Sequence, residues 1–126
     1  MPDVVVDASA MLAVALGEES AEGVAEALDA ARLHAPRLLL LEVANAMTTR
    51  CRREPLRAAQ YAQALHRMLD APITLHEVEP FEVFALALRR HLTAYDAAYL
   101  WLSNQLQCSL LTLDRRLSDA ARTERH

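Results

Sequence analysis

The chain contains no lysine, so arginine accounts for all 13 of its Lys+Arg residues. Signalling domains that accept a phosphoryl group on a strand-end aspartate need a lysine to contact that group, and the missing lysine argues against this class. Phosphatases that form an aspartyl-phosphate are disfavoured for the same reason. They would also carry a second aspartate two positions after Asp7, where this chain has Ser9.

Glycine and cysteine are also scarce. With two glycines and 53% hydrophobic residues, the composition is typical of a globular protein that is poor in loops. The length of 126 residues suits one compact unit, and we expect a single domain over 1–126. Cys51 and Cys108 are too few and too far apart for a disulfide framework, which indicates two reduced thiols.

Long apolar runs are missing as well. No segment approaches the roughly 20 apolar residues that a membrane-spanning helix needs. Met1-Pro2-Asp3 leads directly into a short apolar segment, without the basic region and long apolar stretch of a secretory signal. We therefore expect a cytoplasmic protein that does not enter membranes.

The formal net charge is −4, which argues against a protein that coats nucleic acid with a basic surface. It does not argue against a nuclease. Four carboxylates discussed below amount to this whole charge, and bound divalent cations would reverse its local sign.

The apolar pattern predicts strands that alternate with helices along the whole chain. This alternation is typical of an α/β fold in which helical crossovers connect the strands of a parallel sheet. We expect strands at 4–6, 33–35, 73–78 and 109–113, and the third of them should be half-buried or at an edge. We expect helices at about 10–16, 36–53, 55–69, 80–91, 94–106 and 115–122, and one more that follows 18–20 and ends near 32. The end of the chain, 123–126, should be frayed.

Four acidic residues stand next to otherwise apolar segments. Asp7 follows three valines, Glu42 follows four leucines, Asp96 precedes Ala97–Leu100, and Asp114 follows a leucine-rich segment. The carboxyl ends of parallel strands lie at one edge of a sheet, where such side chains would meet. Oxygen ligands without a paired histidine or cysteine cluster favour Mg²⁺ or Mn²⁺ over zinc.

Each acid also has an ordinary structural explanation. Asp7 could cap the following helix, although Ser9 competes for that position, and Asp114 is a good cap for the last helix. Thr93 followed by Asp96 matches a capping box, and a lone glutamate such as Glu42 is usually solvated. Four structural caps, however, have no reason to share one edge of a sheet, so their coincidence favours a site.

Polar residues near these acids also favour a site. Asn45 and Thr49 lie on the same helical stripe as Glu42, and Thr112 lies two residues before Asp114 on the expected strand. A hydroxyl beside an acid suits metal or phosphate binding, although threonine is also a common strand residue.

The pattern resembles PIN-domain ribonucleases, most closely the VapC-type toxins of bacterial toxin–antitoxin pairs. The segments that carry the resemblance follow the family's order and span nearly the whole chain. They are Val4–Ala10, Pro36–Leu41 leading into Glu42–Ala46, Tyr95–Leu100 and Leu111–Leu117.

The resemblance implies a three-layer α/β/α fold with about four to five short parallel strands and endonucleolytic cleavage of RNA. It also implies a homodimer and an antitoxin protein that holds the enzyme inactive. Mg²⁺ or Mn²⁺ would be held by Asp7, Asp96 and Asp114, with Glu42 binding through water or orienting the nucleophile, while Ser9, Thr112 and Asn45 would support them.

Arginine must supply any contact to RNA phosphates. Arg115 and Arg116 adjoin Asp114 and are the better candidates, because the cluster from Arg50 to Arg57 also suits a solvated helix end. Two alternatives stay open: an RNA-processing PIN nuclease that is not a toxin, and a catalytically silent binding module of the same fold.

Overall fold

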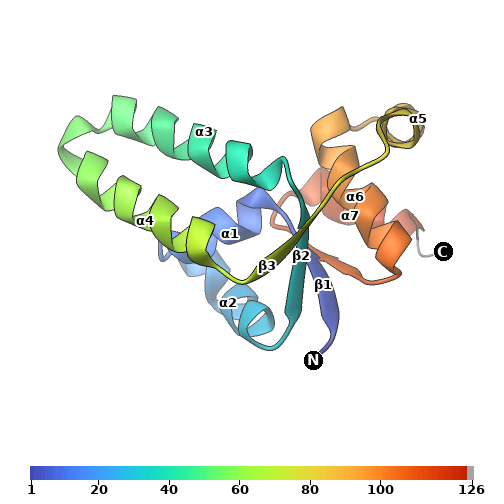
Figure 1. Ribbon diagram of the computed structural model, residues 1–126, viewed down its shortest axis with the longest axis horizontal. Helices are drawn as coiled ribbons and strands as arrows, with labels where there is room; N and C mark the ends of the chain where they lie inside the picture. Colours follow the sequence, from blue (N-terminus) through green and yellow to red (C-terminus); the bar gives the residue numbers. More distant parts are fainter. Residues whose placement is uncertain (125–126) are drawn as a thin grey trace.

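The computed structural model describes residues 1–124, in which a parallel four-stranded sheet stands between two groups of helices (Figure 1). The strands are β1 (Asp3–Val6), β2 (Arg32–Pro36), β3 (Ile73–His76) and β4 (Ser109–Leu111), in the order β3-β2-β1-β4. The expected α/β class with a short-stranded parallel sheet is confirmed, and β3 lies at an edge as predicted.

Helices cover both faces of the sheet (Figure 1). On one side α6 (Ala94–Leu106) packs against β1, β2 and β4 and is flanked by α5 (Pro80–Arg90) and α7 (Arg115–Glu124). On the other side α1 (Ala8–Ala15) packs against α2 (Glu22–Asp29), α3 (Leu39–Arg53) and α4 (Ala58–Asp70). The α3–α4 hairpin projects away from the sheet, and short 3₁₀ turns lie at Glu19–Ala21 and Pro55–Arg57.

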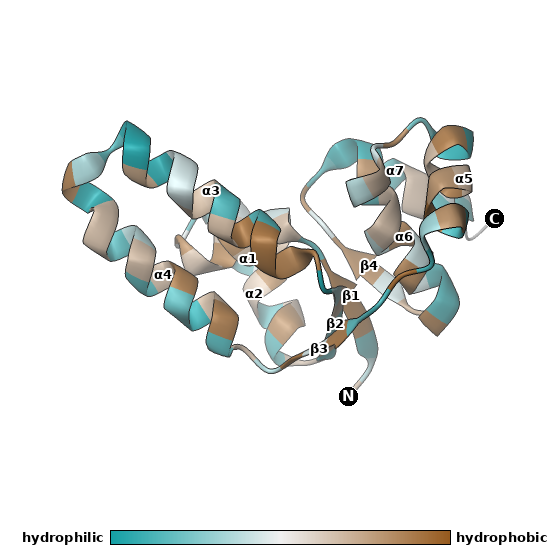
Figure 2. Ribbon diagram, turned by 45° about the horizontal axis from the view of Figure 1, so that its top comes forward, coloured by the Kyte–Doolittle hydropathy of each residue, from teal (hydrophilic) through white to brown (hydrophobic). Residues whose placement is uncertain are grey.

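The core lies along β1 and α6. Val5 and Val6 are fully buried because β1 is a central strand with helices on both faces, as its run of valines predicted. Tyr99 and Leu100 of α6 are also fully buried. Figure 2 shows apolar residues along the strands and α1, and polar residues toward the C-terminal end of α3. Within residues 1–124, no helix combines the length and the apolarity needed to cross a bilayer.

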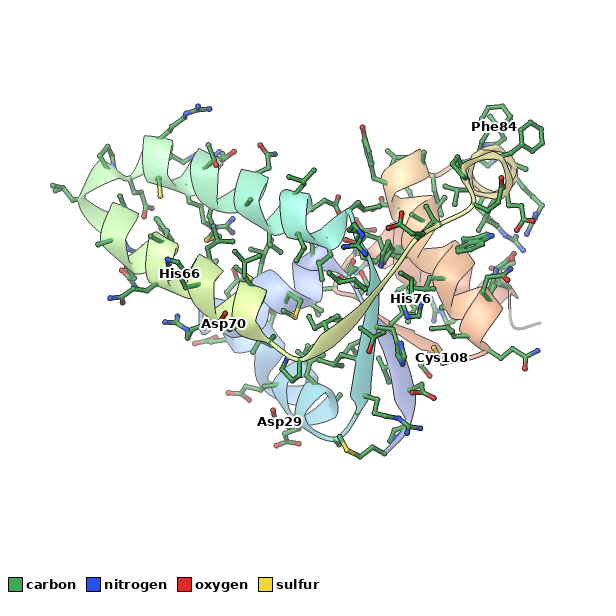
Figure 3. All side chains as sticks on the ribbon, in the orientation of Figure 1. Asp29, His66, Asp70, His76, Phe84 and Cys108 are labelled. Carbon is green, nitrogen blue, oxygen red and sulfur yellow. The ribbon has the colours of Figure 1, made fainter. Side chains whose placement is uncertain are left out.

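The expected helix start at Pro36 is wrong. Pro36 is the last residue of β2 and pairs with His76 at the carboxyl end of β3, where Figure 3 labels the histidine. The missing N–H of proline breaks no bond to β1, because the pairing with β1 extends only to His34. Arg37 continues the ladder by donating its backbone N–H to the His76 carbonyl (3.0 Å), and α3 begins at Leu39.

Other boundaries also differ from the sequence-based expectation. The strand expected at 73–78 ends at His76, and the helix expected from about residue 10 begins at Ala8. The strand expected to reach Leu113 ends at Leu111, and the helix expected to end near Arg32 ends at Asp29. The last helix continues through Thr123 to Glu124 instead of fraying. Long-range contacts hold its end, since Glu124 accepts hydrogen bonds from Arg89 (2.8 Å), Arg90 and Asn104 on α5 and α6. Residues 125–126 of the expected frayed end lie outside the described residues.

Candidate active site

The carboxyl ends of the two adjacent strands β1 and β4 form the centre of the site. Asp7 directly follows β1, and its backbone N–H extends the ladder by donating to the Leu111 carbonyl of β4 (3.2 Å). Only 5% of the Asp7 residue is exposed, which is rare for an aspartate and demands that its oxygens be hydrogen-bonded.

Both oxygens of the Asp7 carboxylate are occupied. Oδ1 accepts from the Ser9 hydroxyl (2.8 Å) and from the Ala10 backbone N–H (3.0 Å), and Oδ2 accepts from the Thr112 hydroxyl (2.5 Å). The bond from Ala10 makes Asp7 the N-cap of α1. Of the two residues that compete for this position, Asp7 therefore takes it, and Ser9 lies in the first turn of the helix.

The two hydroxyls form a small network that closes this edge of the sheet. Ser9 accepts from the Leu113 backbone N–H (2.9 Å), and Thr112 accepts from the Asp114 backbone N–H (3.0 Å). Each hydroxyl has one proton, and both protons point to Asp7. The 3.3 Å contact between Ser9 Oγ and Thr112 Oγ1 is consequently not a strong bond of its own.

Asp114 and Asp96 each lie at the start of a helix, as their sequence context predicted. Asp114 Oδ1 accepts from the Leu117 backbone N–H (3.0 Å) in the first turn of α7. At the start of α6, Thr93 Oγ1 accepts from the Asp96 backbone N–H (3.1 Å), so Thr93 is the N-cap and Asp96 lies in the first turn of the helix. Capping and convergence at one edge thus occur together.

Glu42 lies in the first turn of α3 and is held by a residue that the sequence reasoning missed. Tyr99 of α6, whose exposure is 0%, donates its hydroxyl to Glu42 Oε1 (2.5 Å). In the sequence, Tyr99 stands within the apolar segment Ala97–Leu100, which does not indicate a polar role. Its spacing of three residues from Asp96 places both side chains on one face of α6, a signal that could have identified it.

The pKa values show that the four carboxylates lie near one another. Burial raises the pKa of Asp7, and the charge of Asp114 adds to the rise. Burial likewise raises the pKa of Glu42, with further contributions from Asp96 and Asp7. The pKa of Asp96 is raised by burial and then by Asp114 and Asp7. All four acids identified in the sequence therefore share one electrostatic neighbourhood.

The chemical type of these side chains, rather than their spacing, suits a hard divalent cation. Within residues 1–124, no group of three or more histidine, cysteine or acidic side chains is arranged so that it could hold a metal ion. The donors at this edge are carboxylate oxygens, the ligands that Mg²⁺ and Mn²⁺ prefer. Burial and mutual repulsion both penalise their charged forms, and a bound cation would remove that penalty.

Three further sequence candidates differ in how they relate to this cluster. Asn45 is exposed one turn after Glu42, and among the described residues its side chain makes no hydrogen bond. Arg116 lies close enough to Asp96 for its charge to lower the pKa of that carboxyl, although burial and the acids outweigh it. The neighbouring Arg115 is exposed and is not among the charges that shift the pKa of Asp7, Glu42 or Asp96.

Comparison with known proteins gives consistent results over nearly the whole chain. The PIN domain family matches residues 4–123. Ribonuclease VapC9 of Mycobacterium tuberculosis is 36% identical over 121 residues, which cover 96% of this chain and 93% of that protein. Ribonuclease VapC3 of Pyrobaculum aerophilum is 37% identical over 120 residues, covering 91% and 92%. The crystal structure of PAE2754 from Pyrobaculum aerophilum superposes with a TM-score of 0.75 at 26% identity, covering 98% of this chain and 92% of the other.

Proposed function

Because the chain belongs to the PIN domain family, we propose that it is a divalent-metal-dependent endoribonuclease and the toxin of a toxin–antitoxin pair. The relatives named as VapC ribonucleases support this proposal, since they align over at least 91% of this chain. We also propose that residues 1–126 form one PIN domain.

The observation that carries the proposal is the buried, fully hydrogen-bonded Asp7 inside a group of four carboxylates. Burial, and then the charges of neighbouring acids, raise the pKa of three of these carboxyls, so their charged forms destabilise the fold and a functional reason for the cluster is favoured. We assign Asp7, Asp96 and Asp114 to holding Mg²⁺ or Mn²⁺, with Glu42 acting through a water molecule. The bound ion would activate a water and neutralise charge at the phosphorus.

The surrounding residues hold these carboxylates in place. Ser9 and Thr112 orient the Asp7 carboxylate by donating to its two different oxygens. Tyr99 fixes Glu42 through the bond to Oε1, which leaves Oε2 able to accept a proton from a water. We propose a supporting role for Asn45, which faces solvent on the same stripe of α3.

The experiment is a cleavage assay on structured RNA with Mg²⁺ or Mn²⁺. We expect Asp7→Asn and Asp96→Asn to lower the rate by at least two orders of magnitude, as loss of a group that acts on the reacting atoms does. Asp29→Asn is the matched control, because Asp29 is exposed at the end of α2 on the opposite side of the sheet from α6 (Figure 3). Cleavage by both Asp7→Asn and Asp96→Asn in the presence of a chelator would contradict the proposal.

We propose a homodimer and an antitoxin as the protein partners, and the cytoplasm as the compartment. An exposed apolar stripe on α5 supports a dimer: Phe81, Phe84 and Leu88 are 72%, 52% and 65% exposed, and Phe84 points away from the rest of the molecule (Figure 3). A monomer in light scattering would contradict the dimer. Failure of a co-expressed candidate antitoxin to co-purify would contradict that pairing.

A further inference from the structure

We propose that the RNA strand runs from the acidic site along a basic cleft between the end of α5 and α7, where Arg116 binds a phosphate of the substrate. This inference rests on the proposed ribonuclease function and adds the surface that holds the substrate. The sequence does not distinguish Arg115 from Arg116 as a phosphate ligand, and the structure favours Arg116.

The cleft has a volume of about 290 Å³, and its charged lining residues are three arginines and one aspartate. Arg89, Arg90 and His91 at the end of α5 form one wall, and Arg116 and Asp119 of α7 form part of the other. His91 ends α5 in the left-handed conformation (φ 56°), which turns the chain sharply beside the cleft. An anionic strand is therefore the kind of ligand that this surface fits.

Arg116 links the cleft to the carboxylates, none of which lines it. Arg116 lies two residues after Asp114, in the first turn of α7, and its charge acts on Asp96. A phosphate bound to Arg116 would consequently lie near the acids that are assigned to cleavage. The acids themselves repel a polyanion, so a neighbouring cation is required to hold the RNA there.

Arg116 is also the arginine of the cleft whose donors are not already used. Arg89 and Arg90 both bind Glu124, whose side chain is only 9% exposed, so their guanidinium groups are committed to holding α7 in place. Asp119 is paired with Arg122 one turn later. Within residues 1–124, Arg116 makes no hydrogen bond and no ion pair within 4.0 Å, and it is exposed. Its planar group is free to bind a phosphate through two parallel hydrogen bonds.

Arg115 provides a control within the same helix turn. It has the same charge and is also exposed, but it does not line the cleft. Arg122 gives a second comparison, because it lies on the same helix outside the lining and is neutralised by Asp119. A general effect of lost positive charge would appear in the variants of all three arginines. The loss of a phosphate site at Arg116 would appear in the Arg116 variant alone.

The test is steady-state cleavage of a structured RNA, a hairpin with a single-stranded loop, by the full chain at fixed Mg²⁺ and increasing KCl. For Arg116→Gln we expect kcat/KM to fall about tenfold, mainly through KM, because one charged hydrogen-bonding contact is lost. The slope of log(kcat/KM) against log[KCl] should become shallower by about 0.7, the value for one phosphate contact on a single strand. Arg115→Gln and Arg122→Gln should stay within about twofold of the parent, and Arg116→Lys should restore the salt slope.

Two results would overturn the inference. One is an Arg116→Gln variant with the parent's KM and salt slope, or with changes no larger than those of Arg115→Gln. The other is an Arg116→Gln variant that keeps the parent's RNA kinetics but loses binding to a co-purified protein, which would make the cleft a protein-binding surface. A parent chain that cleaves no RNA would instead show that the proposed function itself is wrong. Circular dichroism of each variant confirms that the exposed substitution leaves the fold intact.

Discussion

Replacing Thr112 by valine removes a single hydroxyl from the edge of the sheet and leaves the side-chain volume nearly unchanged. That hydroxyl donates to Asp7 Oδ2 (2.5 Å) and accepts from the Asp114 backbone N–H (3.0 Å). Asp7 is 5% exposed, so water cannot readily replace the lost donor, whereas the exposed Asp114 can bond to water. The variant therefore measures how much the protein depends on satisfying one buried carboxylate oxygen.

We expect Thr112→Val to lower the free energy of unfolding by about 2 kcal/mol at neutral pH. A hydrogen bond to a charged group contributes roughly 1.5–3 kcal/mol, and the remaining bonds from Ser9 and Ala10 keep the loss from being larger. For a chain of this size, the corresponding decrease in Tm is roughly 6 to 10 °C.

The cost should depend on pH in a defined direction. Burial raises the pKa of Asp7 above its ordinary value of 3.8, and the Thr112 hydrogen bond opposes that rise, so Thr112→Val raises the folded-state pKa further. A carboxyl with a raised folded-state pKa is favoured by folding while it is protonated. Its stabilising contribution is lost as pH rises from the unfolded value through the folded value. The difference between parent and variant should therefore be small near pH 4 and reach its full size at neutral pH.

Urea unfolding at several pH values measures this effect, and Thr112→Ser is the control because serine keeps the hydroxyl. Thr112→Ser loses a methyl group but keeps the hydroxyl, so it should retain most of the pH-dependent stability that Thr112→Val loses. The reasoning is refuted if valine and serine destabilise equally at neutral pH, or if the cost of valine is as large at pH 4 as at pH 7.

Two other substitutions probe polar contacts that the sequence did not reveal. Tyr99→Phe removes the donor to Glu42 Oε1 and should cost about 1–2 kcal/mol. The pKa of Glu42 should rise, because that bond lowers it, and the acidic limb of the pH–rate profile should move to higher pH. His76 Nε2 lies 2.9 Å from His34 Nδ1, and burial followed by the charge of His34 lowers the pKa of His76. Folding thus favours neutral His76, so stability should decrease as pH falls from about 6.5 through the folded value. Urea unfolding should show a smaller decrease for His76→Gln than for the parent, and equal decreases would contradict this assignment.

Local pattern was sufficient for most of the fold. The valines of β1 indicated a strand buried on both faces, and Thr93 and Asp114 marked the starts of α6 and α7 where the structure has them. These features depend on side-chain size, period and capping within a few residues, so a single sequence contains them. Pro36 misled because proline is accepted both at a helix start and at a strand end, and only pairing with His76 distinguishes the two.

The acids of the proposed site were likewise visible as strand-end and helix-start carboxylates. Their chemical type and their order along the chain sufficed to predict that Asp7, Glu42, Asp96 and Asp114 would share one edge of the sheet. What the pattern lacked was the set of partners that hold them. Thr112 is 105 residues from Asp7, and Tyr99 is 57 residues from Glu42.

Such partners depend on which strand lies beside β1 and how α6 packs across it, and no local period encodes either choice. Local sequence also does not distinguish Arg115 from Arg116, which are identical neighbouring residues. Adjacent side chains on a helix point about 100° apart, so the packing of α7 against α6 brings Arg116 into the cleft and leaves Arg115 outside it. Chemical identity and local geometry could be read from the order of residues, whereas the pairing of distant groups required the packed chain.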